Sequence, residues 1–225
     1  LMSVTIPDRV TTIGDYAFRD CTSLTSVTLP DSVTTIGKYA FEKCSGLTDL
    51  VIPAGVTDMG IYPLLGCENL ESVTLPASLK VIESYAFDNC KSLRSVDFAN
   101  NSSLTTIQSH AFENNINLFT FNMPDSIETI EEYAFNSNSC LDIYFYDGKS
   151  SWDSMKKEKN WINGNYTVIT GPETQTNSYA KPSGFSSGIQ YSSPFSNSIT
   201  IKNRDIVRLD AIGALVDNCY NGPAG

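Results

Sequence analysis

The sequence predicts a β-dominated solenoid built from stacked repeats, and three observations support this fold class. A four-residue motif, usually ending in Tyr-Ala-Phe, recurs at intervals of 23, 23, 23, 25 and 23 residues. Leu and Val recur in phase with it at L-x-x-V-x-L spacing. A unit this short buries its apolar side chains only by stacking on its neighbours. The copies lie at residues 15–18, 38–41, 61–64, 84–87, 109–112 and 132–135.

The first part of each repeat reads as a short strand that ends in a turn. In the unit that begins at Cys21, inward apolar residues alternate with outward polar residues, as a strand requires. Leu24, Val27 and Leu29 point inward, whereas Ser26 and Thr28 point outward. Pro30 then ends the strand, because proline has no backbone N–H to donate to a sheet.

The second part of each repeat reads as another short extended segment and a return to the next coil. Residues 32–37 form the extended segment of the same unit. We expect the glycine that follows this segment to supply a turn conformation that other residues resist; it recurs as Gly14, Gly37 and Gly60. The segment Lys38–Cys44 is expected to turn back as a short helical stretch and to place Phe41 in the core.

Composition narrows the functional classes. The chain has 225 residues, 41% of them apolar, so it can bury a sizeable core. Its 15 Lys and Arg against 25 Asp and Glu give a net charge of −10, which argues against nucleic acid and anionic membranes as partners. No apolar run approaches the roughly 18–20 residues of a transmembrane helix, so no membrane insertion is expected.

The chain opens within a repeat. Its first apolar residues lie 23 residues before their counterparts in the next unit: Leu1, Val4 and Ile6 precede Leu24, Val27 and Leu29. A natural solenoid begins with an atypical polar cap that covers its exposed edge. We therefore expect further sequence to precede residue 1.

Four of the six cysteines occupy one repeat position, which asparagine takes over later in the chain; the row is Cys21, Cys44, Cys67, Cys90, Asn115 and Asn138. Neighbouring residues of such a row stack near the ~4.8 Å strand spacing, longer than the ~3.8 Å between Cβ atoms that a disulfide prefers. We expect these thiols to be buried and reduced. Cys140 and Cys219 lie outside the row, and whether they pair stays open.

No catalytic or metal-binding constellation is recognisable, so neither an enzyme nor a cofactor is predicted. The single histidine, His110, falls at the Tyr position of the repeat motif, which explains it without a catalytic role. The Tyr residues themselves either pack between adjacent coils, the favoured interpretation, or stack on a ligand. Motifs for nucleophilic hydrolysis, phosphate or dinucleotide binding and zinc are missing from the sequence.

The full repeat, C/N-x-x-L-x-x-V-x-L-P-x-x-V-x-x-I-G-x-x-A-F-x-x-C, resembles the BspA-like leucine-rich repeat over about residues 1–170. The resemblance implies a β-dominated leucine-rich-repeat solenoid with short strands and short helical turns. It also implies secreted or surface-attached proteins that adhere to proteins or cells. Two departures occur: Ala99–Ser103 replaces the proline turn with two extra residues, and Pro63–Leu64 replaces Ala-Phe.

The organisation changes after the last clear repeat. We expect leucine-rich repeats of 23–25 residues at 1–146, a C-terminal cap at 147–170, a Ser/Gly/Pro-rich linker at 171–198 and a partial β segment at 199–225. In the cap, residues 148–160 read as a helix with Ser151 as its N-cap and with Trp152 and Met155 toward the core. Strands are expected at 142–146, 166–170, 198–202 and 207–216. The last segment carries the run S-I-T-I…L-D-A-I-G, followed by Asn221–Gly225, and on these residues it is similar to part of a jacalin-like β-prism lectin.

The repeats predict a noncatalytic, secreted or cell-surface module that binds a host or cell-surface protein through its concave strand face. The alternative is a carbohydrate-binding protein in which the jacalin-like segment binds a glycan and the repeats form a stalk. The residues expected to form the binding surface are Ser26, Thr28, Asp49, Glu71, Ser72, Thr74, Arg94, Asp97, Phe119 and Asn122.

Overall fold

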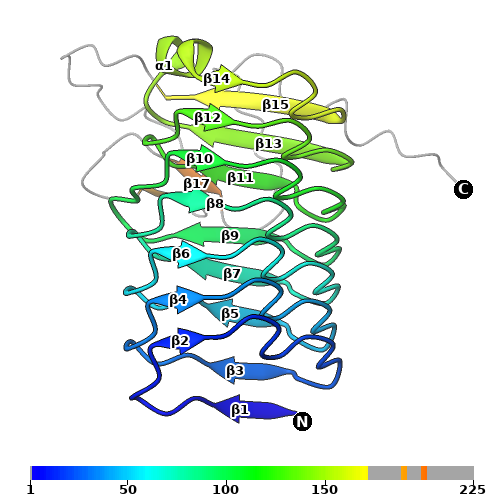
Figure 1. The fold of residues 1–225 in the computed structure, drawn as a ribbon. Coiled ribbons are helices and arrows are strands. Elements are labelled where there is room, and N and C mark those ends of the chain that lie inside the picture. The colour runs from blue at the N-terminus through cyan, green and yellow to red at the C-terminus, as the bar shows by residue number, and fades with distance from the viewer. Residues whose placement is uncertain (1, 172–188, 192–198, 202–225) are drawn as a thin grey trace, which may run out of the picture.

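The computed structural model describes residues 2–171, 189–191 and 199–201. Residues 2–171 wind into a strand-dominated solenoid of about seven coils, which rise as a nearly straight column in Figure 1. The one helix among the described residues is short and lies near the end of the column. The predicted fold class, a β-dominated solenoid of 23-residue units, is therefore confirmed.

The first wall of the solenoid consists of parallel strands, one from each coil. Paired residues lie one repeat apart, as in the register of Ser3 with Ser26 and of Ser72 with Ser95. The strands alternate buried and outward residues, as the sequence predicts. They are β1 (Ser3–Thr5), β3 (Ser26–Thr28), β5 (Asp49–Val51), β7 (Ser72–Leu75), β9 (Ser95–Phe98), β11 (Thr120–Met123), β13 (Cys140–Phe145) and β15 (Asn165–Thr170).

The second wall consists of shorter parallel strands with the same one-repeat register. Ile36 pairs with Ile13 below it and with Met59 above it, and all three side chains are buried. These strands are β2 (Thr12–Ile13), β4 (Thr35–Ile36), β6 (Asp58–Met59), β8 (Val81–Ile82), β10 (Thr106–Ile107), β12 (Thr129–Ile130) and β14 (Lys156–Lys157). Figure 1 shows this wall in front of the first.

The third wall is made of turns, so the short helical stretch expected at Lys38–Cys44 is wrong. Alternate backbone N–H groups bond to the next coil: Tyr16 N donates to Lys38 O at 2.9 Å and Phe18 N to Ala40 O at 2.7 Å. The N–H groups between them close local turns, such as that of Arg19 N with Tyr16 O at 3.1 Å. This segment can pair with its neighbours only because its backbone leaves helical geometry.

Two left-handed residues in each coil create this wall. The aromatic position of the motif takes φ between 56° and 60° in all six copies, which are Tyr16, Tyr39, Tyr62, Tyr85, His110 and Tyr133. The residue four positions later is also left-handed, at Asp20, Lys43, Gly66, Asn89, Asn114 and Ser137. An L residue in this conformation costs roughly 1–2 kcal/mol, which the bonds between coils must offset.

The expected role of Gly14, Gly37 and Gly60 is wrong, because none of them has a positive φ. Gly37 and Gly60 instead allow neighbouring coils to approach closely. A Cβ atom on Gly37 would lie 2.6 Å from the backbone N of Asp15, and one on Gly60 would lie 2.6 Å from that of Lys38. Gly14 has no heavy atom within 4 Å of its hypothetical Cβ.

We predict that Gly37→Ala destabilises the solenoid by about 1–3 kcal/mol, because its methyl group must push two backbones apart. Gly14→Ala is the matched control, since it occupies the same repeat position with open space around it. Urea unfolding of both variants measures the difference. Equal losses of stability would mean that coil spacing does not constrain this position.

Apolar side chains fill the space between the three walls. Phe18 stacks on Phe41 with ring centroids 5.2 Å apart, and Phe112 stacks on Phe87 and Phe135 at 5.1 and 5.2 Å. The departure at Pro63–Leu64 belongs to the same core, because both residues are buried and Leu64 is fully enclosed.

We expect Phe87→Ala to lower the free energy of unfolding by about 3–5 kcal/mol, because the coils above and below cannot collapse into the cavity. Val51→Ala serves as the control, since Val51 is 64% exposed and should lose less than about 1 kcal/mol. Thermal and chemical denaturation test both values. A loss below about 1 kcal/mol for the Phe87 variant would contradict the packing described above.

The cysteine row lies beside the Phe core, and its four thiols are free, as predicted. Cys44, Cys67 and Cys90 are buried, as predicted, whereas Cys21 is half-buried, so the expected burial is wrong for that residue. Each buried thiol donates to a carbonyl of the coil below; the acceptors are Phe18, Phe41 and Leu64, at 3.0, 3.1 and 3.3 Å. Asn continues the row, and the Asn138 side-chain oxygen accepts the backbone N–H of Asn115 at 2.9 Å.

The buried thiols should not react while the protein is folded. Burial raises the pKa of Cys44 to about 12 and that of Cys67 well above its usual value, so the nucleophilic thiolate is scarce at neutral pH. We expect iodoacetamide to label these two thiols and Cys90 only after unfolding, whereas the half-buried Cys21 labels first. Mass spectrometry of peptides from native and unfolded samples measures the order. Rapid labelling of all four in the native protein would contradict this arrangement.

The expected cap forms one further coil, because β14 pairs with β12 in the second wall and β15 pairs with β13 in the first. The helix α1 (Lys149–Ser154) is shorter than the predicted 148–160, and Ser151 is not its N-cap. The N-cap is Gly148 at φ 92°, without a side-chain cap, so the turn geometry sets where the helix starts. Trp152 and Met155 are buried, as predicted.

A two-stranded antiparallel ladder joins β16 (Ile189–Tyr191) to β17 (Ile199–Ile201). β17 agrees with the strand predicted at 198–202, and β16 falls in the expected linker. Most of the jacalin-like segment, including the predicted strand 207–216, lies outside the described residues. Cys140 is disulfide-bonded, but Cys219 lies outside the described residues, so whether these two residues pair stays open.

Candidate interaction surface

The outward side chains of β3, β5, β7, β9 and β11, with the residue just before each strand, form the surface that we call the strand face. Their pairing places them in rows across the sheet: Asp49, Ser72 and Ser95 follow one another, as do Val51, Thr74 and Asp97. The inward residues between these rows, Leu50, Val73 and Val96, are buried. The core therefore holds the strand face in a fixed geometry.

All ten sequence-predicted binding residues lie on the strand face. Ser72 and Thr74, near its centre, are half-buried, and the other eight are exposed. The exposed eight are Ser26, Thr28, Asp49, Glu71, Arg94, Asp97, Phe119 and Asn122. Ser72 and Thr74 are small hydroxyl residues, whereas Glu71, Arg94 and Phe119 are larger.

Among the described residues, the charged side chains of the strand face have no ion-pair partner. In the part of the chain that the structure describes, every ion pair lies elsewhere, for example Arg19 with Glu42 at 2.6 Å. The other pairs are Arg19–Asp20, Lys43–Glu42, Lys91–Glu68, His110–Glu113, Lys149–Asp153 and Lys156–Glu158. Asp49, Glu71, Arg94 and Asp97 take part in none of these pairs.

A neighbouring serine hydrogen-bonds to one of these carboxylates. Ser72 Oγ donates to Asp49 Oδ1 at 2.6 Å, and this bond, with a second from Thr48, holds the pKa of Asp49 below its ordinary value. Asp49 therefore stays ionised at neutral pH. Ser95 Oγ lies 3.4 Å from Asp97 Oδ2 within the same strand.

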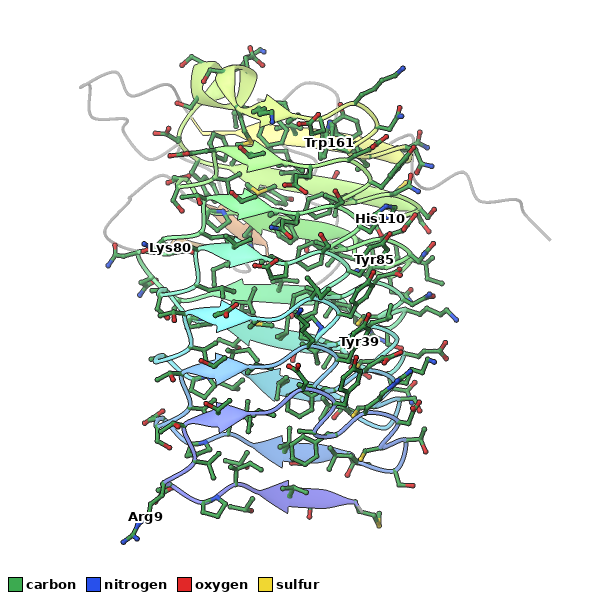
Figure 2. All side chains as sticks on the ribbon, viewed as in Figure 1. Arg9, Tyr39, Lys80, Tyr85, His110 and Trp161 are labelled. Carbon is green, nitrogen blue, oxygen red and sulfur yellow. The ribbon has the colours of Figure 1, made fainter. Side chains whose placement is uncertain are left out.

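The aromatic row on the third wall packs between coils, as the favoured interpretation predicts. Successive ring centroids along Tyr16, Tyr39, Tyr62, Tyr85, His110 and Tyr133 lie 5.0, 4.7, 4.8, 4.4 and 5.0 Å apart. Figure 2 shows Tyr39, Tyr85 and His110 along one edge of the column. Because neighbouring rings cover the ring faces within the row, the row presents ring edges rather than stacking platforms to a ligand.

His110 is part of this packing rather than of a catalytic arrangement. Its ring lies between those of Tyr85 and Tyr133, and its Nδ1 is 2.6 Å from Glu113 Oε2. Asn136 Nδ2 donates to the other oxygen of Glu113 at 2.7 Å. The sequence indicated the position of His110, but it gave no signal for this polar network across coils.

Neither a metal-binding group of side chains nor a membrane-spanning helix is found among the described residues. None of their His, Cys, Asp and Glu side chains gather in groups of three or more that could hold a metal ion. Within the same ranges, no helix combines the length and apolar character that a membrane span requires.

Comparisons with known proteins agree with the fold. The model of the BspA type leucine-rich repeat region matches the chain in six copies, over residues 1–102 and 64–158. The leucine-rich repeat protein TpLRR of T. pallidum has a TM-score of 0.57 at 24% identity, over 74% of this chain and 73% of that chain. One from Bacteroides ovatus has a TM-score of 0.50 at 24% identity, over 76% of this chain and 55% of that chain.

This chain thus spans little more than half of the Bacteroides ovatus protein. The search of curated proteins found no match. The matched repeats nevertheless cover more than half of the 225 residues, and the backbone has the stacked, strand-dominated coils that such repeats require. The chain belongs to the family of BspA-type leucine-rich-repeat proteins.

Proposed function

We propose that this chain is a noncatalytic, secreted or cell-surface module that binds a protein partner through the strand face. The observation that carries the proposal is the set of in-register rows of accessible side chains on a rigid sheet, whose charged members lack ion-pair partners among the described residues. A surface held by a packed core can bind without first ordering its own backbone, which lowers the entropic cost of association.

Membership of the family supports the general part of this proposal. BspA-type repeat proteins are generally associated with surfaces and adhesion, and leucine-rich repeats are typically noncatalytic scaffolds that bind proteins. The rival function, glycan binding through a jacalin-like segment, rests on residues that lie almost entirely outside the described ranges. The two functions use different parts of the chain, so variants can separate them.

We predict that Ser72→Arg combined with Thr74→Arg abolishes binding of the protein partner while stability changes little, because outward strand positions tolerate substitution. Thr34→Arg with Thr57→Arg adds the same charge at exposed positions beside the second wall and should leave binding intact. Host-cell surface proteins captured by the unmodified chain would be identified and purified, and their affinity for each variant measured by calorimetry.

Deletion of residues 172–225 completes the experiment. If the strand face binds the partner, the deletion leaves the affinity for the partner unchanged, since the last strands of the two walls, β14 and β15, end before residue 172. Loss of glycan-array binding on deletion, with no effect of the Ser72 and Thr74 substitutions, would replace this proposal with the lectin alternative. Equal loss of binding in both arginine pairs would point to overall charge rather than to the strand face.

A further inference from the structure

The charges of the strand face have one predominant sign. Asp49, Glu71 and Asp97 contribute three carboxylates and Arg94 one guanidinium, all exposed, on or just before the consecutive strands β5, β7 and β9. Three negative charges against one positive charge leave a net charge of −2 on this part of the sheet. Strands lie about 4.8 Å apart, so β5 and β9 are separated by about 10 Å.

This spacing discriminates between kinds of positive ligand. A metal ion needs several oxygen ligands within about 2.6 Å of one point. The carboxylates of the strand face do not meet this condition, because no group of three or more potential metal ligands is found among the described residues. Dispersed carboxylates match dispersed cations, such as lysine and arginine side chains along a polypeptide.

The uncharged parts of the strand face suit the same kind of ligand. Ser72 and Thr74 are small, so an extended chain can approach the sheet between the charged positions. Val51, which pairs with Thr74, is 64% exposed and offers an apolar contact beside Asp49. A basic segment that also carries an aliphatic side chain would complement both features.

On this basis we propose that the occupant of the strand face is an extended protein segment bearing lysine or arginine side chains, which pair with Asp49, Glu71 and Asp97. This inference rests on the proposed function and adds the chemistry of the partner. Charge complementarity across an interface mainly steers encounter and selects among partners. The strand face would therefore discriminate against acidic segments as well as bind basic ones.

The central experiment compares two neutral substitutions that change net charge equally. Asp49→Asn with Asp97→Asn removes charge from the strand face, whereas Asp8→Asn with Asp31→Asn removes it from exposed residues outside the strand face. The probe is a labelled six-residue peptide of alternating Lys and Val, and its affinity for the full chain is measured by fluorescence anisotropy at physiological salt. We expect about a tenfold loss of affinity for the first pair and little change for the second.

A charge reversal sharpens the result. The double variant Asp49→Lys with Asp97→Lys should no longer bind the Lys-Val peptide and should instead bind the corresponding Glu-Val peptide. Equal loss of affinity in the two asparagine pairs would show attraction to overall charge and overturn the inference, as would no loss in either. Circular dichroism melts of every variant confirm that the solenoid remains folded.

Other occupants are tested on the same intact chain by carbodiimide coupling, which joins a carboxylate to a lysine that contacts it. We expect Asp49 or Asp97 to couple to the peptide. Coupling instead to Lys181 or Lys202 of the same chain, or to a second copy, would assign the strand face to that occupant and overturn the proposal. If the purified natural partner loses affinity with the Ser72 and Thr74 arginine pair but not with the asparagine pair, the proposed function stands and this inference fails.

Discussion

Contact between each residue and its counterpart one repeat away is the constraint on which the rest of the structure depends. It sets the register of the strands in the first and second walls, where paired residues such as Ser72 and Ser95 lie one repeat apart. It also stacks Phe on Phe and Tyr on Tyr at about the same separation, close to 5 Å. The side chain at each buried repeat position must therefore pack against its counterparts in the coils above and below. This explains why the repeat is recognisable in the sequence at all.

Substitutions within the rows show what each position requires. His110 replaces Tyr without interrupting the ring stack, and Leu64 takes the place of Phe while remaining fully buried. Asn138 lies in the row of the buried cysteines, in a position where a small polar group meets a backbone group of the neighbouring coil. Shape and hydrogen-bonding capacity, rather than residue identity, are what the stacked coils demand.

Much of the fold could be predicted from the sequence because apolar spacing reports burial directly. The inward residues Leu24 and Val27 and the row of free cysteines are examples. The third wall could not be predicted, because it depends on backbone conformation that side-chain patterns do not report. A Tyr before Ala-Phe reads as a helical or neutral residue, yet it takes φ near 60° in every copy so that its N–H reaches the next coil. The close approach at Gly37 has the same origin, since it appears only when two coils are placed together.

Outward positions on the strand face do not have to pack against their counterparts in neighbouring coils, as core positions must. An inward residue must match its copies above and below, whereas an outward residue meets solvent and need only tolerate a strand. The outward row that contains Ser26, Asp49 and Ser72 accordingly varies in charge, while its buried neighbours Val27, Leu50 and Val73 vary only among aliphatic side chains. Outward positions can thus acquire recognition chemistry without loss of packing. Asp49 illustrates this. Ser72 lies in the same row one coil away, and its hydroxyl donates a hydrogen bond that stabilises the Asp49 carboxylate. The regular stacking that stabilises the solenoid therefore also fixes the positions of such charged side chains.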